Sequence, residues 1–164
     1  MRTSEMASVA NETPVRSFSI AAFVCRKAGK SHEYLVLKRN CRIYNKTWQM
    51  VSGKLELEEK AWQTALREIK EETGITPARL FSADCVEVFY EHNQNCVNVI
   101  PVFLAFASED CEVILNPEEH SEYRWVPFNE AMELLHFDVQ KKNLAHIEER
   151  FLQRQPNHML EIRF

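Results

Sequence analysis

The pattern of apolar and polar positions predicts a series of short β-strands interleaved with helices. Apolar residues alternate or run together between turn signals over residues 15–26, 34–40, 47–52, 79–92, 96–108 and 122–128, and each stretch is typical of a strand. The polar stretches "NCRIYNK" and "NQN" separate neighbouring strands. Strands mixed with a few helices favour one α/β layered domain.

Helical spacing is clearest between Lys60 and Thr73. Positions i, i+3, i+4 and i+7 of this stretch are apolar, which predicts one face toward the core: Trp62, Ala65, Leu66 and Ile69. Gly74 is expected to end the helix in the left-handed conformation, and Pro77 blocks its continuation.

Two shorter helices are predicted in the last third of the chain. Asn129 is interpreted as the cap of a helix over residues 130–135, and Asp138 as the cap of a second one. The second helix has apolar residues near helical spacing at Val139, Leu144, Ile147 and Phe151.

Length and composition are those of one ordinary globular domain. The chain has 164 residues, of which 45% are hydrophobic and 27% charged. We expect one domain over residues 15–155, with a loose polar tail at 1–14 and a second tail at 156–164. The N-terminus lacks a signal-peptide core, and no apolar run approaches the roughly 20 residues of a membrane helix. These features favour a cytoplasmic protein without membrane contact.

Charge and cysteine content argue against several classes of function. A net charge of −4 and a pI near 5.9 argue against a broad nucleic-acid or anionic-membrane surface. The cysteines are odd in number and include no C-x-x-C pair, so neither a zinc site nor a disulfide framework is indicated. We expect buried or partly buried thiols in a reducing compartment at Cys25, Cys41, Cys85, Cys96 and Cys111.

The segment "VSGKLELEEKAWQTALREIKEETGI" carries the strongest chemical signal. A rotation of about 100° per residue puts Glu68, Glu71 and Glu72 on one flank of the predicted helix. Glu68 and Glu72 lie one turn apart, so their carboxylates can converge, and Arg67 can hold Glu71. Convergent carboxylates repel, and Mg²⁺ or Mn²⁺ is their natural counterion. Because Mg²⁺ prefers few carboxylates together with waters and substrate phosphates, the pattern indicates phosphate-ester chemistry.

A solvated charged face is the alternative explanation of this segment. It accounts for Glu56, Glu58 and Glu59, but less well for a cluster through which basic residues do not alternate. Glycine usage favours a site, because the chain has only three glycines and two of them, Gly53 and Gly74, bracket the segment. Glycine is useful where a backbone must turn or approach a ligand closely.

The same segment resembles the Nudix box, G-x5-E-x7-R-E-U-x-E-E-x-G-U, where U is a bulky apolar residue. The matching positions are Gly53, Glu59, Arg67-Glu68-Ile69, Glu71-Glu72 and Gly74-Ile75. The strand order around the box fits that family over roughly residues 15–155. The resemblance implies an α/β/α sandwich with a mixed β-sheet between helices. It also implies hydrolysis of a nucleoside diphosphate linked to another group.

The resemblance further implies roles for individual residues. Glu68 and Glu72 match the main metal ligands of the family, and Glu71 matches an additional ligand. The backbone carbonyl of Gly53 often joins that set. Arg67 matches the arginine that orients the glutamates.

The residue that accepts a proton from the attacking water is open between Glu68, Glu71 and Glu119. The stretch "NPEEHSEYRWV" resembles a segment of bacterial dihydroneopterin triphosphate and dATP pyrophosphohydrolases, in which an acidic residue before a histidine reaches the metal. Glu119 occupies that position, and a solvated acidic loop is the alternative. His120 alone is interpreted as a surface residue.

Substrate contacts are predicted from the same branch. "TWQMVSGKLE" places Trp48-Gln49 before Ser52-Gly53 as in those enzymes, and Arg39 matches a substrate-contacting arginine. Arg16 and Lys38 are further phosphate candidates, with solvated surface charges as the alternative. The aromatic residues that either stack on a base or belong to the core are Trp48, Phe89, Tyr90 and Phe128.

The leading prediction is Mg²⁺- or Mn²⁺-dependent hydrolysis of a nucleoside triphosphate to monophosphate and pyrophosphate by in-line water attack. A dATP-like or pterin triphosphate is the first choice, although the connection between strands 79–92 and 97–107 is shorter than in the pterin enzymes. The alternatives are ADP-ribose, a dinucleoside polyphosphate or capped RNA as substrate, a non-catalytic nucleotide sensor, and a purely structural acidic helix. The acidic pI counts against long RNA. Homodimers are frequent in the family, although no segment here indicates an interface.

Overall fold

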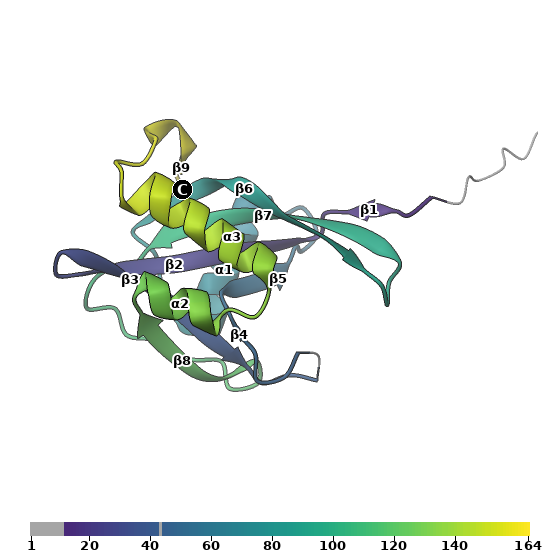
Figure 1. Cartoon of the computed structure of the whole chain (residues 1–164), viewed down its shortest axis with the longest axis horizontal. Coiled ribbons are helices and arrows are strands. Elements are labelled where there is room, and N and C mark those ends of the chain that lie inside the picture. The colour runs from purple at the N-terminus through teal and green to yellow at the C-terminus, as the bar shows by residue number, and fades with distance from the viewer. Residues whose placement is uncertain (1–11, 43) are drawn as a thin grey trace, which may run out of the picture.

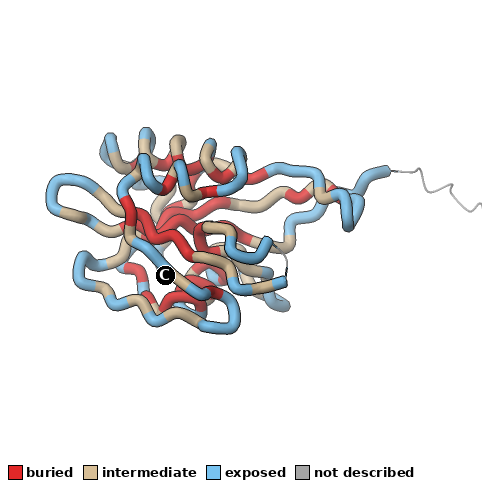
Figure 2. Tube along the Cα trace, turned by 60° about the horizontal axis from the view of Figure 1, so that its bottom comes forward, coloured by how far each residue is buried: buried red, intermediate tan, exposed pale blue. Residues whose placement is uncertain are grey.

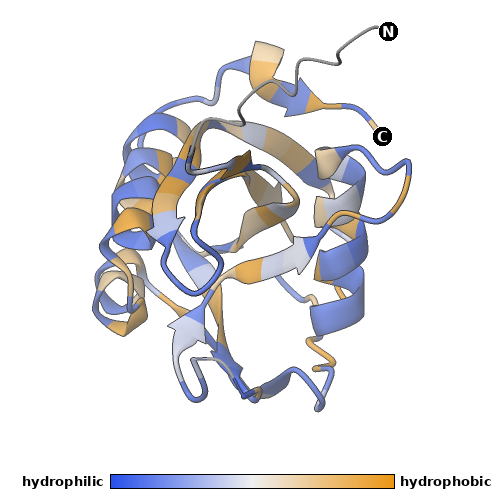
Figure 3. Ribbon diagram, turned by 90° about the vertical axis from the view of Figure 1, so that its right-hand side faces the viewer, coloured by the Kyte–Doolittle hydropathy of each residue, from blue (hydrophilic) through white to orange (hydrophobic). Residues whose placement is uncertain are grey.

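A mixed β-sheet runs through the middle of the molecule, with helices on both of its faces (Figures 1 and 3). The computed structural model describes residues 12–42 and 44–164, so most of the expected N-terminal tail lies outside the described residues. The strands follow the order β4-β3-β2-β7-β6-β9, and β1, β5 and β8 pair with β7, β2 and β3.

The elements follow the predicted order along the chain. The strands are β1 (Val15–Arg16), β2 (Ser19–Ala28), β3 (Ser31–Arg39), β4 (Trp48–Gln49), β5 (Val51–Lys54), β6 (Arg79–Glu91), β7 (Cys96–Phe106), β8 (His120–Val126) and β9 (Glu161–Ile162). The helices are α1 (Ala61–Thr73), α2 (Phe128–Leu134) and α3 (Asp138–Ile147), with a π-helical turn η1 (Glu148–Leu152) and a 3-10 turn η2 (His158–Leu160).

Strand β2 organises the sheet because three other strands pair with it. It runs antiparallel to β3 and β5, and parallel to β7, where Ala21 is opposite Val102. The pairing with β5 places Ile20 opposite Gly53. The C-terminal end of β5, where the acidic segment begins, is therefore held against the sheet.

Two separate cores lie on the two faces of the sheet, because successive residues of β2 point to opposite sides. The core beneath α1 includes Ile20, Ala22, Val24, Ala65 and Ile69. The core beneath α2 and α3 includes Ala21, Phe23, Cys25, Leu135, Leu144 and Ile147. Figure 2 shows buried positions concentrated along the middle of the sheet. The predicted α/β/α sandwich is confirmed.

Helix α1 matches its prediction closely, whereas the starts of α2 and α3 do not. Gly74 has φ 72° and its N–H donates to the Lys70 carbonyl at 2.9 Å. The N-caps of α2 and α3 are Pro127 and Phe137, so Asn129 and Asp138 lie inside the first turns and both predicted caps are wrong. The physical reason is that the positive end of a helix favours the same polar residue types at the cap and in the first turn.

The C-terminal segment 156–164, expected as a tail, joins the sheet instead. Strand β9 pairs with β6 through Leu80 and Ile162, and Arg79 Nε donates to Glu161 Oε1 at 2.7 Å. The division of the chain into a domain over 15–155 and two tails stays a prediction. Among the described residues, no helix has the length and hydropathy needed to cross a membrane.

The five cysteine thiols are buried or partly buried, and no disulfide joins them. Burial raises the pKa of the Cys25 thiol, and it raises the pKa of Cys85 to about 12. These two side chains are therefore uncharged near neutral pH and pack as small apolar groups.

Candidate functional site

The end of β5 and the middle of α1 meet at Gly53 and Glu68. The Glu68 carboxylate lies so close to the Gly53 backbone that a Cβ atom on Gly53 would overlap the Glu68 carboxylate carbon. Glu68 is 8% exposed, and burial raises the pKa of its carboxyl to about 7, with Glu72 and Glu71 adding to the rise and Arg67 opposing it. The absence of a side chain at Gly53 is therefore what gives Glu68 its position.

Arg67 ties the acidic segment together. Its Nε and Nη2 donate to the two oxygens of Glu59 at 2.8 and 3.0 Å, and its Nη1 donates to Glu68 at 2.9 Å and Glu71 at 3.1 Å. A further bond from Nη2 reaches the Lys54 carbonyl at 2.9 Å. These bonds lower the pKa of Glu59 to about 2. The predicted contact with Glu71 is confirmed, and Arg67 also fixes the loop before the helix.

Glu72 pairs with a histidine that lies 48 residues further along the chain. His120 Nε2 lies 2.8 Å from Glu72 Oε2, and the two side chains are 2% and 1% exposed. Burial raises the pKa of Glu72, while the bonds from His120 and from the Ser52 backbone oppose that rise. His120 is therefore buried, and its interpretation as a surface residue is wrong. The physical reason is that strand β8 begins at His120 and pairs it with Arg39 of β3.

Glu119, in the loop before β8, lies close to the pair formed by Glu72 and His120. One ligand atom each from Glu72, Glu119 and His120 lie within 4.8 Å of one another. The loop is held by the Asn40 N–H, which donates to the Glu119 carbonyl at 2.7 Å, and by Asn116 Nδ2, which donates to Glu119 Oε1 at 3.0 Å. The predicted approach of Glu119 to the acidic helix is thus present in the structure.

The residues present fit a divalent cation. Two carboxylates, of Glu68 and Glu72, are buried beside each other, although an ionised carboxylate is costly to bury without a cation. Glu119 adds a third carboxylate on the exposed side. Nδ1 of His120 is buried and has no hydrogen-bond partner among the residues that the structure describes. Carboxylate oxygens suit Mg²⁺ and Mn²⁺.

Without a divalent cation, the protein is expected to lose stability from about pH 5 to about pH 8. The folded-state pKa values of Glu68 and Glu87 are raised from 4.5 to about 7, and that of Glu72 is also raised. These groups favour the folded state fully below pH 4.5, and that contribution disappears as pH rises through the folded-state pKa. Adding Mg²⁺ at pH 8 should restore part of the melting temperature, because binding to the folded state stabilises it.

Thermal denaturation at several pH values, with and without Mg²⁺, measures this effect. NaCl at matched ionic strength controls for general screening. A melting temperature that responds equally to NaCl and MgCl₂ at pH 8 would contradict cation binding at the carboxylates.

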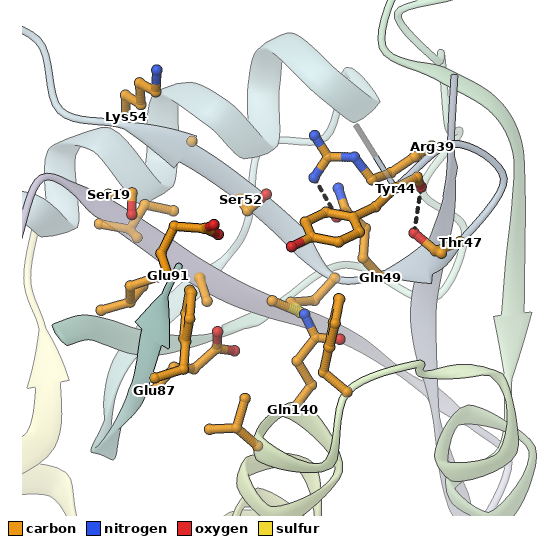
Figure 4. A pocket seen from close by; sticks show the side chains of 18 of the residues that line it. Ser19, Arg39, Tyr44, Thr47, Gln49, Ser52, Lys54, Glu87, Glu91 and Gln140 are labelled. Carbon is orange, nitrogen blue, oxygen red and sulfur yellow. Dashed lines mark hydrogen bonds between the residues drawn. The ribbon is translucent and has the colours of Figure 1, made fainter. Parts of the chain in front are cut away.

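A pocket of about 520 Å³ lies next to the carboxylates of Glu68 and Glu72, on the side of β5 (Figure 4). Ser52 and Gly53 line this pocket and also contact the carboxylates. Its lining includes three predicted substrate residues, namely Arg39, Trp48 and Ser52. Arg39 Nη1 donates to Gln49 Oε1 at 2.9 Å, which holds the guanidinium at the rim. The pocket thus joins the carboxylate cluster to a partly apolar space.

The aromatic predictions divide into two groups. Phe89 and Tyr90 line the pocket from β6, whereas Phe128 packs against the core beneath α2 and α3. Trp48 lines the pocket, although Arg124 lies 4.8 Å from its ring centre and Lys38 5.5 Å. Phe128 therefore belongs to the core. Trp48 lines the pocket and also contacts the charged side chains of Lys38 and Arg124.

Two predicted phosphate residues are engaged elsewhere. Arg16 is exposed and lies 3.5 Å from Gln94 Oε1, and it is outside the residues that line the pocket. Lys38 pairs with Glu122 at 3.2 Å. The structure therefore does not bring Arg16 or Lys38 into the pocket.

Many residues that line the pocket were not predicted from the sequence, and they include Tyr44, Phe137, Glu87 and Gln140. The rings of Tyr44 and Phe137 meet edge to face at 5.2 Å, from segments far apart in the chain. Glu87 could have been found, because Cys85, Glu87 and Phe89 alternate along one strand and share a face.

Comparison with known proteins agrees with this geometry. The NUDIX domain family matches residues 15–154. An asymmetrical bis(5'-nucleosyl)-tetraphosphatase from Rattus norvegicus is 32% identical over 114 residues, which are 68% of this chain and 76% of the relative. The structure of the MutT protein from Methanosarcina mazei is 27% identical, with a TM-score of 0.68 over 84% of this chain and 96% of its own.

The structure of the E. coli dihydroneopterin triphosphate pyrophosphohydrolase shares the fold at 24% identity, with a TM-score of 0.67 over 85% of this chain and 95% of its own. The family match covers nearly all of the described residues and includes the acidic segment with its two bracketing glycines. The chain therefore belongs to the Nudix family of hydrolases, which act on phosphoric anhydrides.

Proposed function

We propose that the protein is a divalent-cation-dependent hydrolase of nucleoside polyphosphates, with a dinucleoside tetraphosphate as its first substrate. The main support for this reaction is that the buried carboxylates of Glu68 and Glu72 lie next to a pocket. Gly53 contacts Glu68, the Ser52 backbone bonds to Glu72, and both Ser52 and Gly53 line the pocket. The substrate choice is supported by the 32% identity with the asymmetrical tetraphosphatase of Rattus norvegicus.

A nucleoside triphosphate remains the second candidate, and the shape of the pocket favours it. Its volume of about 520 Å³ lies in the lower half of the usual range for ligand pockets and suits one nucleoside. The second nucleoside of a dinucleotide would have to lie outside this space. The similarity of Trp48-Gln49 and Ser52-Gly53 to the triphosphate pyrophosphohydrolases supports the same candidate.

Glu68, Glu72 and Glu119 would hold the cation, together with the Gly53 carbonyl, and Glu71 is the additional candidate on the exposed flank. A bound divalent cation neutralises phosphate charge and lowers the pKa of a bound water. Arg67 keeps Glu68 and Glu71 oriented through its two hydrogen bonds.

The candidates for accepting a proton from the attacking water are Glu68, Glu71 and Glu119. Burial raises the pKa of the Glu68 carboxyl to about 7 in the protein without a cation, and a bound cation would lower this pKa and keep Glu68 ionised. Glu119 is exposed and thus open to solvent. Arg39 lines the pocket, where its Nη1 donates to Gln49 and its Nε donates to Cys41 Sγ at 3.1 Å. These two bonds fix the guanidinium in a position from which it would meet phosphate oxygens.

Product analysis with Mg²⁺ and with Mn²⁺ tests the proposal on diadenosine tetraphosphate, dATP, dihydroneopterin triphosphate, ADP-ribose and capped RNA. Asymmetrical cleavage of the tetraphosphate should give one monophosphate and one triphosphate, and EDTA should abolish it. Turnover of triphosphates alone would support the second candidate. Turnover of ADP-ribose or capped RNA alone would exclude both substrates, and binding without turnover would identify a sensor.

A further inference from the structure

The floor of the pocket holds a carboxyl group with no partner in the described part of the chain. Glu87 is 3% exposed, and its Oε1 has no hydrogen-bond partner among the described residues. It lies on β6, where Cys85 on the same face packs into the core beneath α2 and α3. Burial alone raises the pKa of its carboxyl to about 7. A buried acceptor without a hydrogen-bond donor lowers the stability of the free protein, and a ligand that donates to it would remove this cost.

A second acceptor without a partner in the described chain enters the same pocket from the opposite side. Gln140, in the first turn of α3, is 8% exposed, and its Oε1 also lacks a partner among the described residues. Figure 4 shows Glu87 and Gln140 reaching into the hollow from β6 and α3. Two buried hydrogen-bond acceptors thus face one space.

Several other polar side chains that line the pocket make hydrogen bonds, in contrast to the buried oxygens of Glu87 and Gln140. Arg39 bonds to Gln49, and Thr47 Oγ1 donates to the Tyr44 carbonyl at 2.7 Å. Glu91, two residues after Phe89 on the same strand, accepts two bonds from Asn93 at 3.1 Å. Among the described residues that line the pocket, the buried side-chain oxygens without a hydrogen-bond partner are Glu87 Oε1 and Gln140 Oε1.

The surroundings of the two acceptors suit a nucleobase better than a phosphate or a sugar. Ile100 and Val139 give apolar walls nearby, and Phe137 and Phe89 add aromatic surface. A carboxylate at this end repels phosphate, which fits the separate cation cluster at the Gly53 end. A flat apolar ligand whose edge carries N–H groups would satisfy both acceptors at once.

We infer that Glu87 and Gln140 are specificity-determining residues that accept hydrogen bonds from a nucleobase edge and select bases with an exocyclic amine. The inference rests on the proposed function, since it assigns the base end of the same nucleotide site. Adenine carries an exocyclic amine at C6 and guanine carries one at C2, whereas hypoxanthine has none and offers only its ring N–H on that edge. A site with buried acceptors rejects an analogue without the matching donor, because the acceptors are then left unpaired.

Binding of AMP, GMP and IMP without a divalent cation tests the inference independently of catalysis. Calorimetry on the wild-type chain should show AMP or GMP binding at least about 10-fold more tightly than IMP, and the tighter of the two identifies the base. The Glu87→Gln variant, which exchanges an acceptor oxygen for a donor, should lose this discrimination. Equal affinities of the wild-type chain for AMP, GMP and IMP would overturn the inference.

Glu91→Gln is the matched control, because it makes the same chemical change on the same strand and in the same pocket. It should change the preference less than about twofold, since Glu91 is already satisfied by Asn93. Gln140→Met removes the second acceptor with little change in side-chain volume. If Glu87→Gln does not fold, Gln140→Met is used in its place and should lose the same discrimination. If both Glu87→Gln and Gln140→Met keep the wild-type preference, the assignment is wrong.

Steady-state kinetics separate this inference from the proposed function. In a catalytically active chain, Glu87→Gln should raise KM for the amine-bearing substrate about 10-fold and leave kcat nearly unchanged. Turnover with an unaltered base preference in Glu87→Gln would reject the inference and keep the function. Amine-dependent binding in a chain that hydrolyses nothing would support the inference and reject the function.

Discussion

Replacing Glu72 by glutamine should lower kcat by about 10²- to 10⁴-fold, the range expected when a carboxylate that positions the reacting groups is neutralised. Glu72 is 1% exposed and is held between His120 and the Ser52 backbone. Glutamine keeps the length and the acceptor oxygen that faces His120. The loss should therefore reflect missing charge and not a collapsed helix.

Steady-state kinetics across Mg²⁺ concentrations, together with melting temperatures, separate these causes. At pH 8 and without Mg²⁺, Glu72→Gln should be at least as stable as the wild type, because a buried carboxyl with a raised pKa has been removed. Glu58→Gln provides the control, since Glu58 is an exposed acid of the same segment. Activity of Glu72→Gln within fivefold of the wild type would contradict its role.

Adding a single methyl group at Gly53 should lower kcat/KM by at least about 100-fold, as expected when a ligand is displaced from a metal site. The Cβ of Gly53→Ala would overlap the carboxylate of Glu68, and the flexible end of that side chain is the part able to move. The carboxylate would turn away from the Gly53 carbonyl and from Glu72. Metal affinity and activity should fall together, while the fold is retained.

Gly29→Ala should show the opposite combination of effects. No atom lies within 4 Å of a Cβ at Gly29, but its φ of 62° is strained for alanine and should cost about 1 kcal/mol of stability. Its activity should stay at the wild-type level. Melting temperatures, Mg²⁺ titrations and kcat/KM of the two variants measure the contrast. A fully active Gly53→Ala enzyme would show that Glu68 does not depend on the bare backbone.

The features predicted correctly from the sequence are those that depend on neighbouring residues in the chain. The apolar stripe of α1, its end at Gly74 and the contact of Arg67 with Glu71 follow from helical geometry over a few turns. The presence of helices on both faces of the sheet was instead implied by the resemblance to the Nudix family, and the structure explains it by the alternation of β2 residues between two cores.

Contacts between distant segments were harder to predict. His120 meets Glu72 because β8 pairs with β3, and Gln140 faces Glu87 because α3 packs against β6. Neither of these contacts produces a periodic pattern in the sequence. A histidine beside acidic residues is as typical of an exposed loop as of a buried site. The position of Arg16 outside the pocket lining could not be predicted for the same reason, since the sequence shows its charge but not its tertiary contacts.

The parallel pairing of β2 with β7 governs when the pocket can appear during folding. Its register joins Ala21 to Val102, so a long loop must close before the contacts within the sheet can compensate for the lost chain entropy. Strand β5 carries Gly53 on the β2 side, and β6 carries Glu87 on the β7 side. No continuous short fragment therefore contains both ends of the site, and recovery of activity during refolding reports completion of this long-range pairing.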